Sequence, residues 1–206
     1  MTNPSFDLHQ PYEDQYLVQQ IRSGDYTAFT QLYNKYAPAL TQYGLKFNAG
    51  LPVIEDSLHD VFVWVWANRH KLEVHHSIKS YLFKSVRTSI LHALEKTNKF
   101  RSLEQEEENN YHFELELSPE GLALQNENQR LVREQVAKLL NRLTAKQKEV
   151  IYLRYYEGLC FEDIAANMNL SVKACYKIMG RAITTLRENI PNSRVLLIFL
   201  LYLRQL

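Results

Sequence analysis

Apolar side chains recur at intervals of three and four residues along most of this chain of 206 residues, and strand-like alternation is nearly absent. This spacing is typical of amphipathic helices, which turn one apolar stripe toward a core. Residues 29–45 suit one long helix, although Pro38 inside it is expected to kink it or to mark a join. Helices are also expected over 53–70 and 79–99, so the N-terminal half is predicted to be all-α.

The stretch from Phe161 to Glu188 has the pattern of two helices joined by a tight turn. Ser171 follows the first helix, and its hydroxyl is a good N-cap for the second. One face of the second helix is apolar, and the other carries Lys173, Tyr176, Lys177, Arg181 and Thr184. This layout suits a helix-turn-helix whose second helix enters the DNA major groove. An ordinary helical hairpin with a solvated basic face fits the pattern equally well.

Two further helices are expected before this stretch. The apolar positions from Leu131 to Leu143 indicate one, and Thr144 with Gln147 resembles a capping box that opens the next. That second helix is expected to run from Ala145 to Tyr156. It is expected to contribute four side chains to a core: Val150, Ile151, Leu153 and Tyr155.

The formal net charge of +1 conceals a strong segregation of charge along the chain. Residues 24–100 carry a net +3 and residues 129–190 a net +5, whereas residues 101–128 carry −7 and lack periodicity. We therefore predict an all-α protein in which two small helical domains are joined by an acidic flexible linker. The expected boundaries are an arm over 1–14, domains over 15–100 and 129–190, the linker over 101–128 and an apolar tail over 191–206.

Residues 54–66 combine an apolar stripe with a second, acidic face. Asp56, His59 and Asp60 are grouped on that second face in the first two turns. Acidic residues are favourable there because they lie at the positive end of the helix macrodipole. The same grouping would also form an acidic docking face for a basic partner. Trp64 lies outside the apolar stripe and is expected to be exposed.

Residues 68–78 read as a loop rich in polar and stacking side chains, and the helix that follows has a basic exterior. This combination suits single-stranded nucleic acid, in which bases stack on planar side chains and phosphates meet cations. A solvated charged face is the simpler interpretation of the same residues.

The tail contains nine consecutive apolar residues, Val195–Leu203. As a helix they would span about 14 Å, roughly half of a bilayer core, so a transmembrane segment is not expected. Three alternatives are left open: docking against the chain's own domains, binding of a partner, or shallow association with a membrane.

No sequence motif points to catalysis or to a cofactor. The chain has no Gly-rich phosphate loop and no GxSxG or HExxH motif. His75 and His76 are adjacent and lack partners at zinc spacing, so no metal site is expected. Cys160 and Cys175 favour a reduced, cytoplasmic setting, and the polar first thirty residues lack a signal peptide. We expect no enzyme activity and no small-molecule substrate.

Four stretches are distinctive in their order and spacing: FTQLYNKYAPAL (29–40), IEDSLHDVFVWVW (54–66), SYLFKSVRTSILHAL (80–94) and residues 143–187. In turn they resemble the opening of region 2, the polymerase-binding helix, the helix behind promoter melting and region 4 of a known family. That family is the extracytoplasmic-function (ECF) sigma factors of the sigma-70 superfamily, which are promoter-recognition subunits of bacterial RNA polymerase. The resemblance covers about residues 15–190.

The resemblance implies roles for three sets of residues. Core RNA polymerase would bind the 54–66 helix through Asp56, His59, Asp60, Phe62 and Trp66. The upstream, minus-thirty-five element would be read by Ser171, Lys173, Ala174, Tyr176, Lys177 and Arg181. The minus-ten element would be melted and captured by Asn68, Arg69, His75, His76, Lys84 and Arg87. The acidic linker would thread toward the catalytic channel of the polymerase.

The implied function is that of an alternative sigma factor, which binds core RNA polymerase and directs promoter recognition and transcription initiation. The implied partners are core polymerase, promoter DNA and an anti-sigma factor, commonly one tethered to the inner membrane. The chain departs from the family pattern at four places: it has His59 for Gln, Thr88 for Asn, Ala174-Cys175 for Thr-Val, and Cys160 for a Ser or Thr cap.

The main alternative is a stand-alone helix-turn-helix regulator whose N-terminal domain dimerises or binds an effector. A structural interaction protein comes third. The acidic helix 54–66 discriminates between the first two, because a stand-alone regulator has no need of a polymerase-docking face and its DNA binding should survive charge reversal there.

Overall fold

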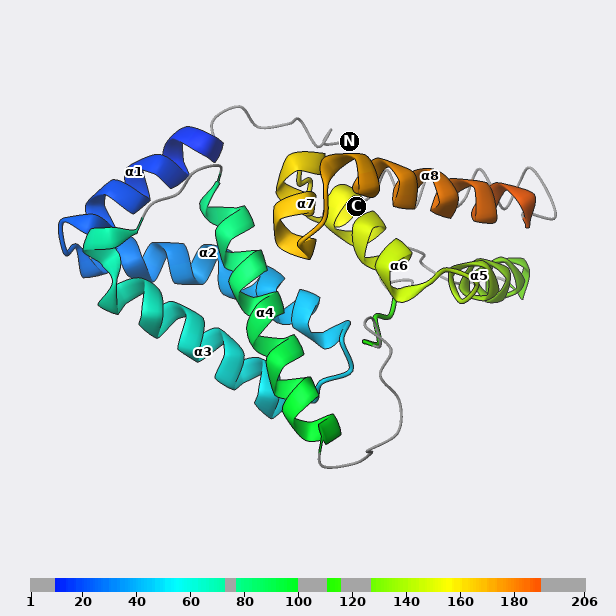
Figure 1. Cartoon of the computed structure of the whole chain (residues 1–206), viewed down its shortest axis with the longest axis horizontal. Coiled ribbons are helices and arrows are strands. Elements are labelled where there is room, and N and C mark those ends of the chain that lie inside the picture. The colour runs from blue at the N-terminus through cyan, green and yellow to red at the C-terminus, as the bar shows by residue number, and fades with distance from the viewer. Residues whose placement is uncertain (1–9, 73–76, 100–110, 116–126, 190–206) are drawn as a thin grey trace. The chain divides into compact units, whose positions relative to one another are not determined.

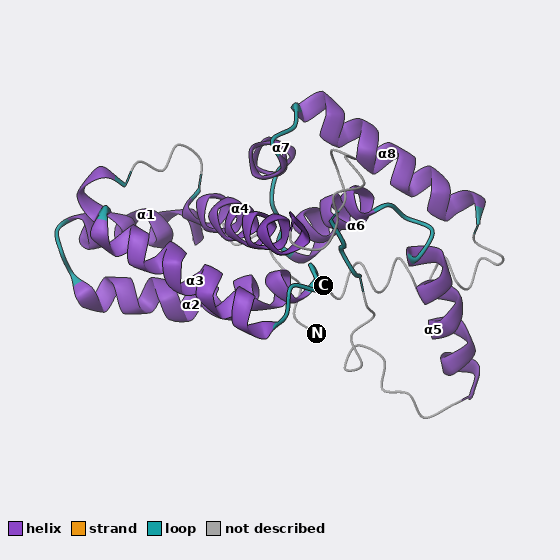
Figure 2. Ribbon diagram, turned by 60° about the horizontal axis from the view of Figure 1, so that its bottom comes forward, coloured by secondary structure: helices purple, strands orange, loops and turns teal. Residues whose placement is uncertain are grey.

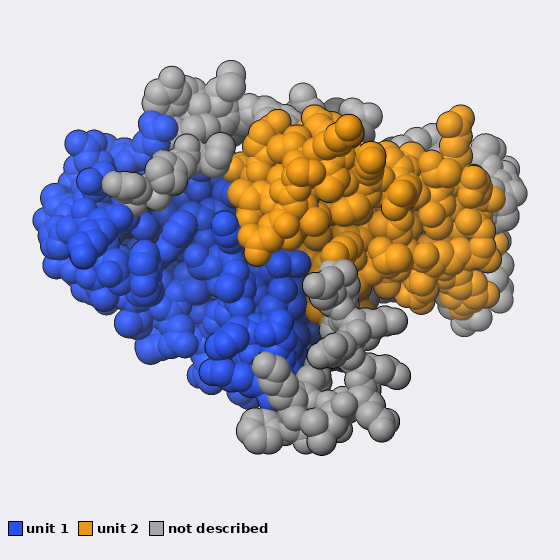
Figure 3. Space-filling model, in the orientation of Figure 1, with its two compact units in different colours: residues 1–109 blue, residues 110–206 orange. Residues whose placement is uncertain are grey.

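The computed structural model describes residues 10–72, 77–99, 111–115 and 127–189. Every regular element within these ranges is a helix, as Figures 1 and 2 show. The chain divides into two compact units, unit 1 (residues 1–109) and unit 2 (residues 110–206), coloured separately in Figure 3. The all-α prediction is confirmed for the described part of the chain.

Unit 1 contains α1 (Gln10–Arg22), α2 (Tyr26–Leu45), α3 (Leu51–Ala67), the 3-10 helix η1 (Arg69–Lys71) and α4 (Ile78–Lys99). The helices α2, α3 and α4 pack against one another in pairs. At Gly44, α2 approaches its neighbours so closely that a Cβ atom would lie 2.7 Å from Cγ2 of Ile54. The largest fully buried side chains of this core include Tyr43, Phe47, Phe83, Leu32, Leu40 and Ile90.

The start of α2 is set by the Asp25 carboxylate. Its Oδ1 accepts hydrogen bonds from the backbone N–H groups of Thr27 at 2.7 Å and Ala28 at 3.3 Å. The helix continues through Pro38, so Pro38 does not mark a join between two helices. The carbonyl that loses its helical donor there belongs to Asn34, and both residues are exposed, so water can satisfy that carbonyl.

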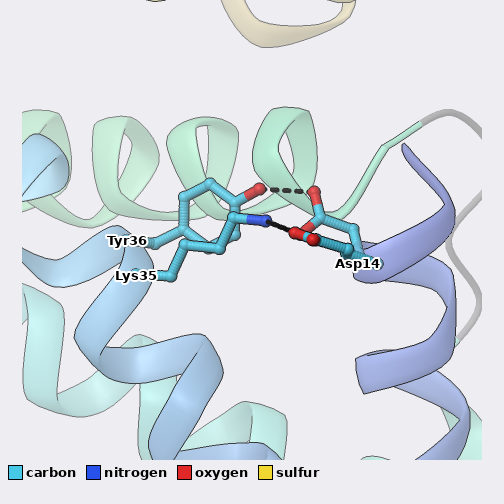
Figure 4. Close-up of polar contacts among 4 residues, drawn as sticks. Asp14, Lys35 and Tyr36 are labelled. Atoms are coloured by element: carbon cyan, nitrogen blue, oxygen red, sulfur yellow. Dashed lines mark hydrogen bonds and ion pairs between the residues drawn. The ribbon is translucent and has the colours of Figure 1, made fainter. Parts of the chain in front are cut away.

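A polar cluster fixes α1 to α2 (Figure 4). Asp14 of α1 accepts a hydrogen bond from Nζ of Lys35 at 2.8 Å and another from the hydroxyl of Tyr36. Asp14 is only 8% exposed, and a carboxylate so far removed from water requires such partners. The cluster therefore specifies which turn of α1 lies against α2.

Unit 2 contains α5 (Glu127–Leu140), α6 (Ala145–Ile151), the π-helical turn η2 (Tyr152–Tyr156), α7 (Phe161–Met168) and α8 (Val172–Glu188). The predicted capping box is present at the start of α6. Oγ1 of Thr144 accepts from the backbone N–H of Gln147 at 3.3 Å, and Oε1 of Gln147 accepts from that of Thr144 at 2.9 Å.

The helix predicted over residues 145–156 is not α-helical throughout. Its last five residues form η2, in which hydrogen bonds reach one residue further back than in an α-helix. The change of pitch turns Tyr155 outward, where it is 39% exposed, while Tyr152 is 3% exposed. The predicted core position of Tyr155 is therefore wrong, because α-helical spacing does not hold over this turn.

Part of the predicted linker belongs to unit 2. Within Tyr111–Leu115, Phe113 is 1% exposed and Leu115 is 7% exposed, so both lie in a core. Within the linker predicted over 101–128, these residues are therefore packed and not solvent-exposed. The arm up to residue 9, the remainder of the linker up to residue 126 and the tail from residue 190 lie outside the described residues. In the described part, no helix is long and apolar enough to cross a bilayer.

Candidate nucleic-acid interface and docking face

The turn between α7 and α8 has a defined geometry. Asn169 ends α7 in a left-handed conformation with φ of 52°, and the N–H of Leu170 returns to the carbonyl of Ala165 at 2.9 Å. At the start of α8, Oγ of Ser171 accepts a hydrogen bond from the N–H of Ala174 at 3.2 Å. These bonds fix the direction in which α8 leaves α7. The hydroxyl of Ser171 therefore acts as the N-cap of α8.

The face of α8 predicted to read DNA is exposed. Lys173, Lys177 and Arg181 are all exposed and follow at intervals of four, so their charges form one stripe along the helix. No acidic residue occurs in α8 before Glu188. The opposite face is buried at Cys175, Met179, Ala182 and Leu186. This arrangement offers cations to phosphates along a helix whose other face is held by unit 2.

An aromatic stack supports the start of this stripe. The ring of Tyr176 lies 4.1 Å from that of Phe161 on α7, centroid to centroid, with the planes inclined by 32°. On Phe161, the guanidinium of Arg154 lies 5.4 Å from the ring centre and donates to the carbonyl of Leu159 at 3.0 Å. Tyr176 is nevertheless 55% exposed. Phe161 and Arg154 were not among the predicted site residues, because their contact joins residues seven positions apart on different helical elements.

The surroundings of both cysteines disfavour the thiolate form. Burial raises the pKa of the Cys160 thiol, and burial also raises the pKa of the Cys175 thiol. Sγ of Cys160 instead caps α7, accepting from the N–H of Asp163 at 3.4 Å. Over the described residues, no three His, Cys, Asp or Glu side chains are grouped so as to hold a metal ion.

The acidic face predicted on α3 is exposed. The side chains of His59 and Asp60 are 77% and 79% exposed, with His59 Nδ1 and Asp60 Oδ1 3.9 Å apart, and Asp56 is also exposed. Phe62 is 3% exposed and Trp66 is half-buried, so these two predicted docking residues are less accessible than the acidic face.

Three aromatic residues of α2 extend this face. The ring centroid of Trp66 lies 5.5 Å from that of Tyr26 and 5.1 Å from that of Phe29, while Tyr33 lies 4.8 Å from Phe62. Tyr26 is 66% exposed and Tyr33 is 43% exposed. Phe29 and Tyr33 lie four residues apart within the amphipathic helix expected over 29–45. Helical spacing alone cannot distinguish a core ring from one at the rim of a face.

Of the residues predicted to bind the minus-ten element, only some lie at the surface. Asn68 ends α3, where its Nδ2 donates to the carbonyl of Trp64 at 3.0 Å, and Lys84 is exposed on α4. Arg69 is half-buried and lies over Trp66 at 4.7 Å, with Nη1 donating to the Trp66 carbonyl at 2.9 Å. His75 and His76 lie outside the described residues.

Arg87 differs from the rest of that set, because it is only 7% exposed and so does not present its guanidinium on the surface. On the neighbouring face, Trp64 is 48% exposed, which confirms the expectation that it lies outside the core. Its ring lies 6.1 Å from that of Tyr81 on α4.

A protein-family model and two known proteins match this chain. The family model for sigma-70, region 4, matches residues 133–186, which include α6, η2, α7 and nearly all of α8. RNA polymerase sigma factor NccH of Alcaligenes xylosoxydans xylosoxydans is 24% identical over 197 residues, 91% of this chain and 100% of that protein. RNA polymerase sigma factor CnrH of Cupriavidus metallidurans is 29% identical over 176 residues, 82% and 90% of the two chains.

Two solved structures of sigma factors are also similar to this chain. CnrH in complex with the cytosolic domain of CnrY matches with a TM-score of 0.55 and 26% identity, over 85% of this chain and 96% of that chain. Sigma factor RpoE of Bartonella quintana, in complex with the anti-sigma factor NepR, matches in fold with a TM-score of 0.56 and 23% identity, over 78% and 95%. Over most of its length the chain is similar to RNA polymerase sigma factors, and residues 133–186 match region 4 of sigma-70.

The extent of these matches disfavours a stand-alone regulator. A helix-turn-helix shared with other regulators would account for residues 133–186 only, whereas the two curated relatives match over 91% and 82% of this chain. Unit 1 is therefore part of the family resemblance. Members of this family are promoter-recognition subunits and not enzymes.

Proposed function

We propose that this sigma factor binds core RNA polymerase through the acidic and aromatic face of unit 1 and places α8 of unit 2 on promoter DNA. The observation that carries the proposal is the division of labour between the units. Unit 1 exposes Asp56, His59 and Asp60 on α3, whereas unit 2 exposes the cationic stripe of Lys173, Lys177 and Arg181 on α8. Faces of opposite charge on separate units suit two different partners.

On unit 1, the proposed polymerase-docking face combines charge with exposed rings. Asp56 and Asp60 would meet cationic side chains, with His59 between them, while the rings of Tyr26 and Tyr33 would bury apolar area beside them. Phe62 and Trp66 hold those rings in place. Aromatic anchors next to a charged rim are the usual composition of a protein interface that binds tightly.

On unit 2, the proposed role of α8 is to read the upstream element. Lys173, Lys177 and Arg181 would contact phosphates or base edges in the major groove, and Tyr176 would lie at the end of the helix that enters first. Ala174 is half-buried near that end and would limit how closely the helix approaches the bases. Ser171 would act through the cap that orients this end of the helix.

For the minus-ten element we propose the end of α3 and the face of α4. Lys84 would bind phosphate, and Asn68 and Arg69 would position the loop that captures an unpaired base, with His75 and His76 within that loop. Arg87 is left out of this face because it is 7% exposed.

We also propose an anti-sigma factor as a regulatory partner. Two structural neighbours are sigma factors solved with a bound partner, the cytosolic domain of CnrY in one case and the anti-sigma factor NepR in the other. A partner of this kind, tethered to the membrane in the manner the family resemblance implies, would hold the sigma factor in the cytoplasm until a signal releases it. Its binding should compete with that of core polymerase.

The direct test is in vitro transcription on a pool of genomic promoters with purified core polymerase. The proposal predicts discrete start sites that appear only when both this chain and core polymerase are present. Promoter binding by the chain alone, unchanged by core polymerase and without initiation, would instead support a stand-alone regulator.

A further inference from the structure

Two glycines lie inside helices of the described residues, and packing within the chain explains only one of them. Gly44 in α2 is required, because a Cβ atom there would lie 2.7 Å from Cγ2 of Ile54. Gly180 lies in the middle of α8 and is exposed, and no atom of the described residues comes within 4 Å of the place where its Cβ atom would stand. The described part of unit 2 therefore leaves room for a side chain at this position.

The backbone of α8 does not require a glycine at this position either. Gly180 has the right-handed conformation of the helix around it, in contrast to Gly24, Gly50 and Gly158, whose φ angles are positive. Any L residue adopts a right-handed helical conformation. A glycine inside a helix is nevertheless unfavourable, because it loses more conformational freedom on folding than an alanine does. α8 thus contains a destabilising residue that no described neighbour in the chain explains.

Gly180 lies on the face of α8 that is proposed to read DNA. It follows Tyr176 by four residues and Lys177 by three, so it neighbours both of them on the helix surface, and Arg181 is the next residue. All four positions are exposed, and the buried side chains of α8 lie on its opposite face. A helical side chain covers the turn before its own Cα atom. The missing side chain of Gly180 therefore leaves the backbone bare between Tyr176 and Lys177.

We infer that this bare stretch of α8 is where the helix comes closest to a base pair of the upstream element, and that Gly180 thereby determines which base pair is accepted there. The inference rests on the proposed function, in which this face of α8 enters the major groove. The groove is about 12 Å wide and a helix with its side chains is about 10–12 Å across, so little clearance is left. Thymine presents its C5-methyl group in that groove. A glycine admits this group against the helix backbone, whereas a Cβ atom would occupy the same space.

Replacement of Gly180 by alanine is expected to stabilise α8 and to weaken DNA binding. In Gly180→Ala, the backbone amides of α8 should exchange with solvent about 4- to 5-fold more slowly, as expected when Ala replaces Gly inside a helix. Hydrogen exchange of the free chain, followed by mass spectrometry, measures this effect. The affinity of holoenzyme for a promoter fragment should fall at least about fivefold, because an added methyl group is unfavourable in a closely packed contact. Since the two effects are opposite, unfolding of α8 cannot account for the weaker binding.

Gly180→Leu distinguishes steric exclusion from stiffening of α8. Leucine favours a helix nearly as much as alanine does, but its side chain is much larger. If close approach limits the affinity, the leucine variant should bind the promoter fragment at least about fivefold more weakly than the alanine variant. Equal losses in the two variants would assign the effect to the stiffness of α8. No loss in either would show that DNA does not come close to Gly180, and each of these two results would overturn the inference.

The base preference of the protein tests its specificity directly. Holoenzyme selects fragments from a promoter pool in which the upstream element is randomised, and the selected sequences are compared between the unmodified chain and Gly180→Ala. The preference should turn against thymine at one or two adjacent base pairs and stay the same at the others. A uniform loss of affinity with unaltered base preference would mean that the added methyl group meets the phosphodiester backbone, and it would overturn the inference.

Lys177→Ala, measured in parallel, separates this inference from the proposed function. If Lys177→Ala weakens promoter binding and Gly180→Ala does not, α8 reads DNA but Gly180 is not its point of closest approach. If neither variant weakens promoter binding, α8 does not read the upstream element and the proposed function fails.

Discussion

The ring of Tyr176 on α8 lies against the ring of Phe161 on α7, with 4.1 Å between their centroids. This contact joins the two helices of the helix-turn-helix at its exposed edge. The guanidinium of Arg154 lies over Phe161, so Tyr176, which we propose faces DNA, rests on a supported ring. The stack keeps Tyr176 in one orientation although more than half of it is exposed.

Two replacements of Tyr176 distinguish the contribution of its ring from that of its hydroxyl. Tyr176→Ala should weaken binding to the upstream element about 2- to 10-fold, because an aromatic pair contributes roughly 0.5–1.5 kcal/mol beyond its buried area. Tyr176→Phe keeps the stack and should bind within about 2-fold of the unmodified chain. Holoenzyme affinity for a promoter fragment is the measurement. An equal loss in both variants would assign the effect to the hydroxyl and not to the stack.

The salt dependence of promoter binding tests the cationic stripe. Each phosphate contact contributes about 0.9 to the slope of log affinity against log salt concentration, so Lys177→Ala should lower that slope by about one unit. Lys138→Ala removes an equally exposed charge from α5 of the same unit and should leave the slope unchanged. Titrations at four salt concentrations provide the comparison. Identical slopes in all three proteins would remove Lys177 from the DNA face.

The adjacent acidic residues Asp14 and Glu13 are expected to contribute unequally to the stability of unit 1. Asp14→Ala should lower the free energy of unfolding of unit 1 by about 2–3 kcal/mol, because it removes the carboxylate that accepts from the buried Tyr36 hydroxyl and from the Lys35 ammonium. Glu13 lies 3.5 Å from the same ammonium but is 68% exposed, so Glu13→Ala should cost less than about 1 kcal/mol.

Urea unfolding followed by tryptophan fluorescence measures both Asp14→Ala and Glu13→Ala. The only two tryptophans, Trp64 and Trp66, belong to unit 1, so the signal reports that unit alone. Equal midpoints for the two variants would show that the buried cluster contributes no more than the exposed ion pair.

The burial of Tyr152 predicts that the protein loses stability at alkaline pH. Burial raises the pKa of Tyr152 well above its ordinary value of 10.0, and the carboxylate of Glu157 raises it further. The unfolded chain therefore releases the phenolic proton first, so stability is complete below pH 10 and falls as the pH rises above it. Between pH 9 and pH 11 the chain should lose about 1.4 kcal/mol more than the Tyr152→Phe variant. Urea unfolding followed by circular dichroism at both pH values makes the measurement, and parallel losses would refute it.

The sequence predicted the helices well where amphipathic spacing is long and uninterrupted. The stripe of Cys175, Met179 and Ala182 was recognisable because helical spacing persists through α8. The capping pair Thr144 and Gln147 was recognisable because its hydrogen bonds are local. Both features depend on residues within a few positions of one another, which is the information that a single sequence holds.

The features that the sequence did not predict depend on distant partners. Phe113 reads as part of an acidic linker because its neighbours are polar, whereas its burial and its contact with Tyr152 place it in a core. Tyr155 was misplaced because a π-helical turn interrupts the α-helical period. Arg87 has the composition of a DNA contact, but the packing around α4 buries it. In each case tertiary packing overrode a local pattern.

The most direct test of the central claim is a charge reversal on α3. Asp60 is 79% exposed, so Asp60→Lys should leave unit 1 folded while it repels a basic partner surface. We expect the affinity of Asp60→Lys for core RNA polymerase to fall at least about tenfold. Its circular dichroism should be unchanged, and the chain alone should still bind an upstream-element fragment. Glu95→Lys makes the same change at another exposed acid of unit 1 and should leave core affinity intact. Unchanged core affinity in Asp60→Lys, or an equal loss in both variants, would contradict the proposed docking face.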